Sequence, residues 1–266
     1  MANSYQLSLS DGTLLGIKAG DPASTPIVVN LAKVMQLDLS PNKTLQTLVV
    51  SAEEYIVQND TKDDCPLYKQ TSHQEDLVIR LTECSLVIAQ YIQQRGGILL
   101  HGALAEINGK AIILAAPGGT GKTTASRRLP LPWHSWSDDM SLIIPCRPGE
   151  YWAHPWPTWS RFNNGEVGGS WQTKAAFPLQ AVFFLEQSRI ESLKTVGKGE
   201  AASLLVQSNK QANQGLDYLK KNNQARYDWH KRFENICNLV QTVPVYVLQL
   251  SLYGSFWPLI YDVLEG

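Results

Sequence analysis

The chain has 266 residues, and its 23 Lys and Arg nearly balance its 24 Asp and Glu. This balance gives no electrostatic reason to expect nucleic acid or an anionic membrane surface as a partner. Apolar residues make up 44% of the sequence, which argues against wholesale disorder and predicts a sizeable core. No apolar run approaches the ~20 residues of a membrane helix, and the first residues lack the pattern of a secretory signal.

Four cysteines lie far apart in the sequence, and none forms a CxxC pair: Cys65, Cys84, Cys146 and Cys237. This spacing favours reduced thiols over a disulfide framework or a zinc site. Together with the missing signal pattern, it predicts a cytoplasmic protein.

The first part of the chain alternates short apolar stretches with turn residues. Strands are expected at residues 5–9, 14–17 and 27–29, separated by Asp-Gly and Gly-Asp-Pro turns. We therefore predict a β-rich N-terminal region over residues 1–74 and a second domain over residues 75–266. A single integrated unit is the alternative.

A helix and a hairpin should open the second part. Ser72 and Glu75 have the spacing of a capping box, and apolar residues then recur at helical intervals from Leu77 until two glycines at 96–97. Residues 98–101 and 111–114 are apolar enough for buried strands, joined by a turn at Asn108-Gly109.

The remaining elements predict a mixed α/β fold. Strands are expected at 140–146, 181–185 and 243–252, and helices at 201–206, 229–240 and 256–264. The polar, glycine-rich stretch 163–170 should be mobile.

The strongest functional signal is the glycine-rich segment 116–123, which has the Walker A pattern except that Ala116 replaces the first glycine. Such a loop turns its N–H groups toward one anion, while Lys122 supplies a cation for the β- and γ-phosphates and Thr123 a hydroxyl for Mg²⁺. An apolar strand precedes it and a helix can follow. The expected nucleotide-binding residues are Ala116, Pro117, Gly118, Gly119, Thr120, Gly121, Lys122, Thr123 and Thr124. A glycine-rich turn without a ligand is the alternative.

A carboxylate pair, Asp138 and Asp139, follows next to an expected strand. Adjacent side chains at a strand end point to opposite sides. One carboxylate can therefore face Mg²⁺ and the other a substrate hydroxyl. A solvated turn is the alternative.

These residues together resemble the catalytic core of HPr kinase/phosphorylase. The resemblance rests on His101-Gly102, the hairpin, the loop and Asp138-Asp139, and it covers about residues 99–146. The loop and aspartates are also similar to phosphoenolpyruvate carboxykinase, which shares that kinase's nucleotide fold but is about twice as long. The first ninety residues and the C-terminal signature of the classical kinase are not matched. The segment 154–160 resembles a related branch from peptide-modification clusters, the SynChlorMet cassette proteins.

The resemblance implies a P-loop kinase core that uses ATP and Mg²⁺. It implies that Lys122 and the loop amides bind the β-phosphate, Thr123 and Asp139 bind Mg²⁺, and Asp138 is the general base with His101 beside it. A core histidine without a catalytic role is the alternative for His101.

Outside this core, two cations and two tryptophans are weaker candidates. Arg161 and Lys174 flank the glycine-rich stretch and could close on the transferred phosphoryl group, or they are surface charges. Trp156 and Trp159 could line a peptide groove, although clustered tryptophans more often build core.

The sequence thus predicts an ATP-dependent phosphotransferase that acts on a hydroxyl, expected to be a serine or threonine of a small protein or peptide. A regulatory nucleotide-binding protein, a plain NTPase and a small-molecule kinase are the alternatives. The sequence does not choose between ATP and GTP. A homo-oligomer is one expectation, because the resembled kinases assemble.

Overall fold

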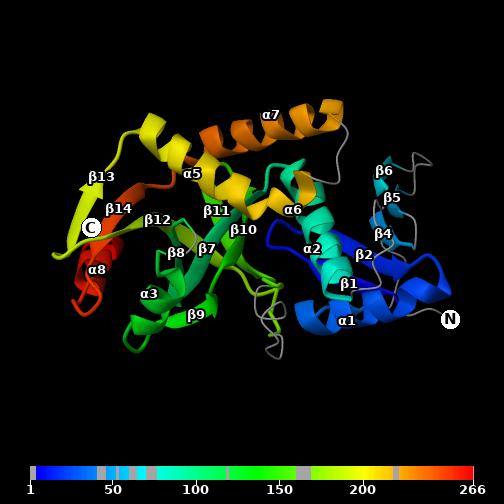
Figure 1. Ribbon diagram of the computed structural model, residues 1–266, viewed down its shortest axis with the longest axis horizontal. Coiled ribbons are helices and arrows are strands. Elements are labelled where there is room, and N and C mark those ends of the chain that lie inside the picture. The colour runs from blue at the N-terminus through cyan, green and yellow to red at the C-terminus, as the bar shows by residue number, and fades with distance from the viewer. Residues whose placement is uncertain are drawn as a thin grey trace.

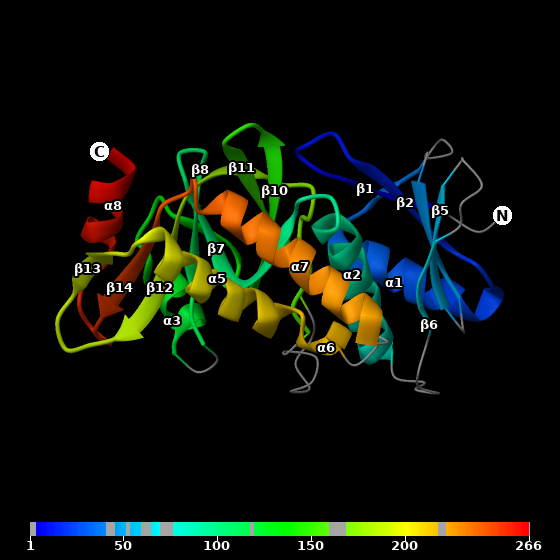
Figure 2. The same ribbon diagram turned by 90° about the horizontal axis from the view of Figure 1, so that it is seen from above.

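The computed structural model describes residues 4–40, 46–51, 54–59, 65–69, 77–117, 120–159, 169–217 and 222–265. It contains two β-sheets and several helices, so the mixed α/β class is confirmed. The molecule is elongated, with the N-terminal sheet at one end and the C-terminal helix at the other (Figures 1 and 2).

The N-terminal region forms a six-stranded sheet with the order β3-β1-β2-β4-β5-β6. Its strands are β1 (Tyr5–Ser8), β2 (Leu14–Ala19), β3 (Asp38–Leu39), β4 (Gln46–Val50), β5 (Glu54–Asn59) and β6 (Cys65–Lys69). The prediction of β-structure here is confirmed for residues 5–8 and 14–17.

The strand predicted at residues 27–29 is wrong, because these residues lie in helix α1 (Thr25–Met35). A short 3₁₀ turn, η1 (Pro22–Ser24), precedes the helix and is capped by Asp21. The buried residues of α1 recur at intervals of three and four: Val28, Leu31, Ala32 and Met35. This helical spacing outweighs the strand preference of the three β-branched residues.

The predicted helix after residue 76 is present as α2 (Leu77–Gln93). It ends before Gly96, whose φ of 103° suits glycine at a helix terminus. Ser72 and Glu75, the expected capping pair, lie outside the described residues.

The second sheet has eight strands in the order β11-β10-β7-β8-β12-β14-β13, with β9 paired to β7. Its strands are β7 (Ile98–Ile107), β8 (Lys110–Ala115), β9 (His134–Ser137), β10 (Met140–Arg147), β11 (Glu150–Trp156), β12 (Phe177–Gln187), β13 (Ser192–Thr195) and β14 (Val245–Leu250). The predicted hairpin is confirmed: β7 and β8 are antiparallel, and Asn108 and Gly109 both have positive φ. Strands β8, β12 and β14 run parallel.

Helices cover both faces of this sheet (Figure 1). They are α3 (Lys122–Arg128), α5 (Lys198–Ala212), α6 (Gln214–Asp217), α7 (Asn222–Leu239) and α8 (Trp257–Glu265). One apolar cluster joins α5 and α7 to the sheet, and a second cluster joins α3 and α8 to its other face. The helices predicted at 201–206, 229–240 and 256–264 are therefore confirmed.

A third apolar cluster joins the N-terminal sheet, α1 and α2 to β10 and the segment after β11. Leu15 of β2 and Trp156 of β11 both belong to it. The boundary between residues 74 and 75 stays a prediction, and it falls in a segment outside the described residues.

Within the described part of the chain, no helix is both long and apolar enough to cross a bilayer. Cys84, Cys146 and Cys237 are free thiols, and the side chain of Cys65 lies outside the description.

Candidate functional site

The glycine-rich segment connects the end of β8 to the start of α3, as the sequence predicts. Gly121 caps the helix with a φ of 104°, a conformation that side chains rarely adopt. Lys122 is the first helical residue, followed by half-buried Thr123 and exposed Thr124. Gly118 and Gly119 lie outside the described residues.

Lys122 is held inside the loop rather than in solvent. Its side chain is 6% exposed, and its Nζ donates to the carbonyl oxygen of Ala116 at 3.1 Å. Burial lowers the pKa of Lys122, whereas the charges of Asp139 and Asp138 oppose this shift. The loop therefore encloses a desolvated amine at the place where the Walker A pattern predicts one.

His101 and Asp139 meet beside this lysine. His101 Nε2 lies 2.8 Å from Asp139 Oδ1, and Lys122 Nζ lies 3.7 Å from the same oxygen. The antiparallel register of β7 and β10 pairs His101 with Met140, which brings Asp139 to the histidine. Three residues predicted from distant parts of the sequence are thus in one cluster.

The sequence analysis expected His101 beside Asp138, and this placement stays a prediction. The structure gives the histidine contact to Asp139. The strand register explains this contact, because Met140 pairs with His101 and Asp139 directly precedes Met140. Asp138 still acts on Lys122, since its charge raises the pKa of that amine.

Asp139 receives a second hydrogen bond from a residue that sequence reasoning missed. Thr158, two residues after β11, donates its hydroxyl to Asp139 Oδ2 at 3.0 Å. Burial alone would raise the pKa of Asp139, but the hydrogen bond and charge of His101, the charge of Lys122 and the Thr158 hydroxyl together hold it below its usual value. The carboxylate is therefore ionised at neutral pH.

The other ring nitrogen of His101 contacts helix α5. Nδ1 lies 3.0 Å from the Gln211 side-chain amide oxygen, and the Ser208 hydroxyl donates to the His101 carbonyl at 3.2 Å. Nothing local in the sequence marks Gln211 as part of the site, because the contact spans 110 positions. Helix α5 thus fixes the ring that faces Asp139.

The remaining candidates lie elsewhere. Lys174 pairs with Asp38 of β3 at 3.1 Å, in the N-terminal region. Arg161 and residues 163–168 of the glycine-rich stretch lie outside the described residues. Trp156 is fully buried and Trp159 is 6% exposed, so both build core rather than an open groove.

The donor set around the loop suits Mg²⁺ bound together with phosphate. Among the described residues, no group of three or more His, Cys, Asp and Glu side chains could hold a metal alone. Mg²⁺ is usually held by one or two carboxylates, waters and substrate phosphates. Thr123, Asp138 and Asp139 provide oxygen donors of that kind.

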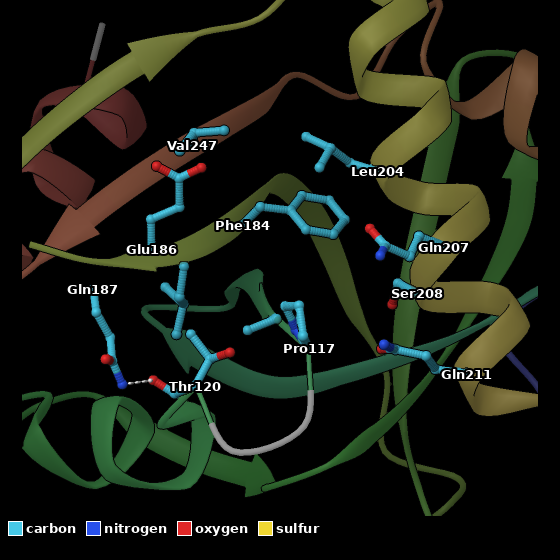
Figure 3. A pocket seen from close by; sticks show the side chains of 12 residues that line it. Pro117, Thr120, Phe184, Glu186, Gln187, Leu204, Gln207, Ser208, Gln211 and Val247 are labelled. Carbon is cyan, nitrogen blue, oxygen red and sulfur yellow. Dashed lines mark hydrogen bonds between the residues drawn. The ribbon is translucent and has the colours of Figure 1, made fainter.

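A pocket of about 470 Å³ opens next to the loop (Figure 3). Its walls come from the loop, the carboxyl end of β12, one residue of β14 and one face of α5. In α/β folds, ligands commonly bind beyond the carboxyl ends of parallel strands.

Comparison with known proteins assigns the chain to a family. The model of the family described as SynChlorMet cassette protein ScmC matches residues 65–265. No curated protein matches the chain. The family match includes the loop, the His101–Asp139 pair, Thr158 and the pocket, and it covers well over half of the sequence. This protein therefore belongs to the ScmC family of SynChlorMet cassette proteins.

Proposed function

We propose that this protein is an ATP-dependent phosphotransferase that moves the γ-phosphoryl group to a hydroxyl, namely a serine or threonine of a small protein or peptide. The observation that carries the proposal is the cluster of Lys122, His101 and Asp139 beside the glycine-rich loop. The proposal includes a P-loop kinase core similar to that of HPr kinase. Its support is the sequence pattern of residues 116–123 and the position of these side chains.

Lys122 is the proposed cation for the phosphate chain. Its contact with the Ala116 carbonyl holds the amine inside the loop before nucleotide arrives. A phosphate oxygen in place of this carbonyl would form a charge-assisted hydrogen bond with a buried ammonium, which would favour binding.

Thr123 and Asp138 are the proposed protein ligands of Mg²⁺. When bound, the ion would neutralise charge on the phosphate oxygens during transfer. Asp138 is assigned this role because its charge acts on the Lys122 amine at the proposed phosphate site.

Asp139 is the proposed general base. It is kept ionised by its neighbours, and His101 fixes the direction of its oxygens. The carboxylate would accept the proton of the acceptor hydroxyl as that oxygen attacks the γ-phosphorus, while the bond from the γ-phosphorus to the β–γ bridging oxygen breaks and ADP leaves. Lys122, 3.7 Å away, would stabilise the negative charge of the phosphoryl group as it moves.

The test combines transfer and binding. The protein is incubated with labelled Mg-ATP and with peptides encoded beside its gene, and acceptor masses are then measured. We expect one added phosphate per acceptor. Asp139→Asn should lower the transfer rate about 10²–10⁴-fold with little change in ATP affinity, whereas Lys122→Ala should weaken ATP binding itself.

Three outcomes would contradict the proposal. Release of free phosphate without any modified acceptor indicates a plain NTPase. Tight ATP binding without turnover indicates a regulatory protein. Phosphate found on a metabolite instead of a peptide indicates a small-molecule kinase.

A further inference from the structure

The pocket beside the loop borders the nucleotide site without containing the reactive cluster. Pro117 and Thr120 of the loop form one side of it, and Phe184 and Leu204 form a facing apolar wall (Figure 3). His101, Lys122, Asp138 and Asp139 do not line it. An acceptor hydroxyl must reach those residues, so the group that fills this pocket lies away from the transferred phosphate.

The lining also excludes an anionic occupant. Among the described residues of the wall, none carries a positive charge, and Glu186 carries a negative one. A phosphate group placed here would meet the negative charge of Glu186, whose Oε2 accepts a hydrogen bond from the neutral Gln249 amide at 3.2 Å. The phosphate chain should therefore lie next to Lys122, and the pocket suits an uncharged group.

The remaining side chains suit a flat, polar-edged ring. The aromatic ring of Phe184 lines the pocket; its side chain is 6% exposed and otherwise packs in the apolar cluster of α5 and α7. Gln207 and Gln211 project from α5 with Leu204, at helical spacing of three and four residues. Primary amides can both donate to and accept from the edge of a nucleobase, and a carboxylate such as Glu186 can accept from ribose hydroxyls.

We propose that this pocket is the nucleoside subsite, where the base of the nucleoside triphosphate stacks on Phe184 and meets the amide of Gln207, with the ribose toward Glu186. This inference rests on the proposed function, because it places the other end of the same nucleotide. Gln211 also touches His101, so one helix contacts both the nucleoside pocket and the catalytic pair.

The test compares two probes that share the phosphate chain and differ in the nucleoside. Affinities for Mg-ATP and Mg-tripolyphosphate are measured by calorimetry on the full chain. The wild type should bind Mg-ATP about tenfold or more tightly than Mg-tripolyphosphate, the gain typical of one stacked base. Phe184→Leu and the pocket-filling Gln207→Trp should remove most of that gain and leave tripolyphosphate binding within about twofold.

Ser203→Trp is the matched control, because Ser203 is exposed on α5 and does not line the pocket. It should leave both affinities unchanged. Thermal unfolding of each variant shows whether it is folded, and Gln207 is exposed enough to tolerate replacement.

The results separate the two proposals. A wild type that binds neither probe overturns the phosphotransferase and the subsite together. Equal losses of affinity for both probes in the pocket variants overturn the subsite alone. Unchanged ATP affinity with a raised KM for the acceptor peptide also overturns the subsite, because the pocket would then be an acceptor site.

Discussion

At Asp139, two hydrogen-bonding side chains and one cation from separate parts of the fold converge on one carboxylate. His101 comes from β7, Lys122 from the start of α3 and Thr158 from the segment after β11. Lys122, His101 and the aspartate pair could be predicted because they stand in a motif of known chemistry. Thr158 and Gln211 could not, because only the folded sheet and α5 bring them to the site.

Thr158 should act as a positioning residue for Asp139. Thr158→Val removes the hydroxyl donor, so the pKa of Asp139 should rise. The acidic limb of the kcat/KM profile should then move to higher pH, with a rate loss of about tenfold or less at neutral pH. Thr158→Ser should restore the wild-type profile. An unshifted limb in Thr158→Val would show that the hydroxyl has a structural role only.

At the scale of elements, local sequence patterns predicted the secondary structure best where a single strong signal was present. The Asn108-Gly109 turn and the apolar runs beside it gave the β7–β8 hairpin correctly. Strand β11 was missed, and it contains Pro155, a residue that is uncommon within strands. The strand tolerates this proline because its pairing with β12 is confined to Trp152 and Ala153.

His154 ties β11 to the turn between β1 and β2, and it should make stability depend on pH. Its Nε2 faces both the backbone N–H (3.3 Å) and the hydroxyl (2.8 Å) of Ser10, so Nδ1 carries the proton and donates to the Thr173 carbonyl. Burial lowers the pKa of His154 below its unfolded value of about 6.5. This effect outweighs the Thr173 hydrogen bond and the charge of Asp11, which both raise the pKa.

The sign of the effect follows from linkage. Below pH ~6.5 the unfolded chain binds the proton that the folded histidine resists, so the unfolding free energy should fall as pH drops toward the folded pKa. The slope for one proton is at most about 1.4 kcal/mol per pH unit. Denaturant titrations between pH 7.5 and 5 should show a smaller slope for His154→Gln than for the wild type. Equal slopes would contradict this assignment.

A buried amide joins α7 to the end of α2 in the same way. Asn235 of α7 donates to the carbonyls of Gln93 and Gly97 at 2.7 and 2.9 Å. Asn235→Ala leaves both buried acceptors without this donor, at a cost of about 2–4 kcal/mol in unfolding free energy. Asn238→Ala, exposed on the same helix, should cost less than about 0.5 kcal/mol. Similar losses in denaturant midpoints for the two variants would argue against a structural role of the amide.

At the scale of the whole molecule, the N-terminal sheet shares its core with the part that carries the candidate site. Leu15 and Leu48 of that sheet lie in one cluster with Leu142 of β10 and Trp156 of β11. The Trp171 backbone N–H also donates to the Val34 carbonyl of α1. We therefore expect the N-terminal sheet and the part that carries the candidate site to unfold together.

The distribution of tryptophan makes this expectation measurable, since all eight tryptophans lie at residue 133 or later. Their fluorescence therefore reports on the second part of the chain and, through Trp156 and Trp159 in the shared cluster, on its contact with the N-terminal sheet. Leu15→Ala, which truncates a side chain that is 1% exposed in β2, should lower the unfolding free energy by about 2–5 kcal/mol and shift the fluorescence midpoint with it. Leu14→Ala changes the neighbouring residue, 51% exposed, and should shift it little. If Leu15→Ala leaves the tryptophan transition in place while circular dichroism shows an earlier loss of structure, the N-terminal sheet unfolds independently and the shared cluster does not couple the two parts.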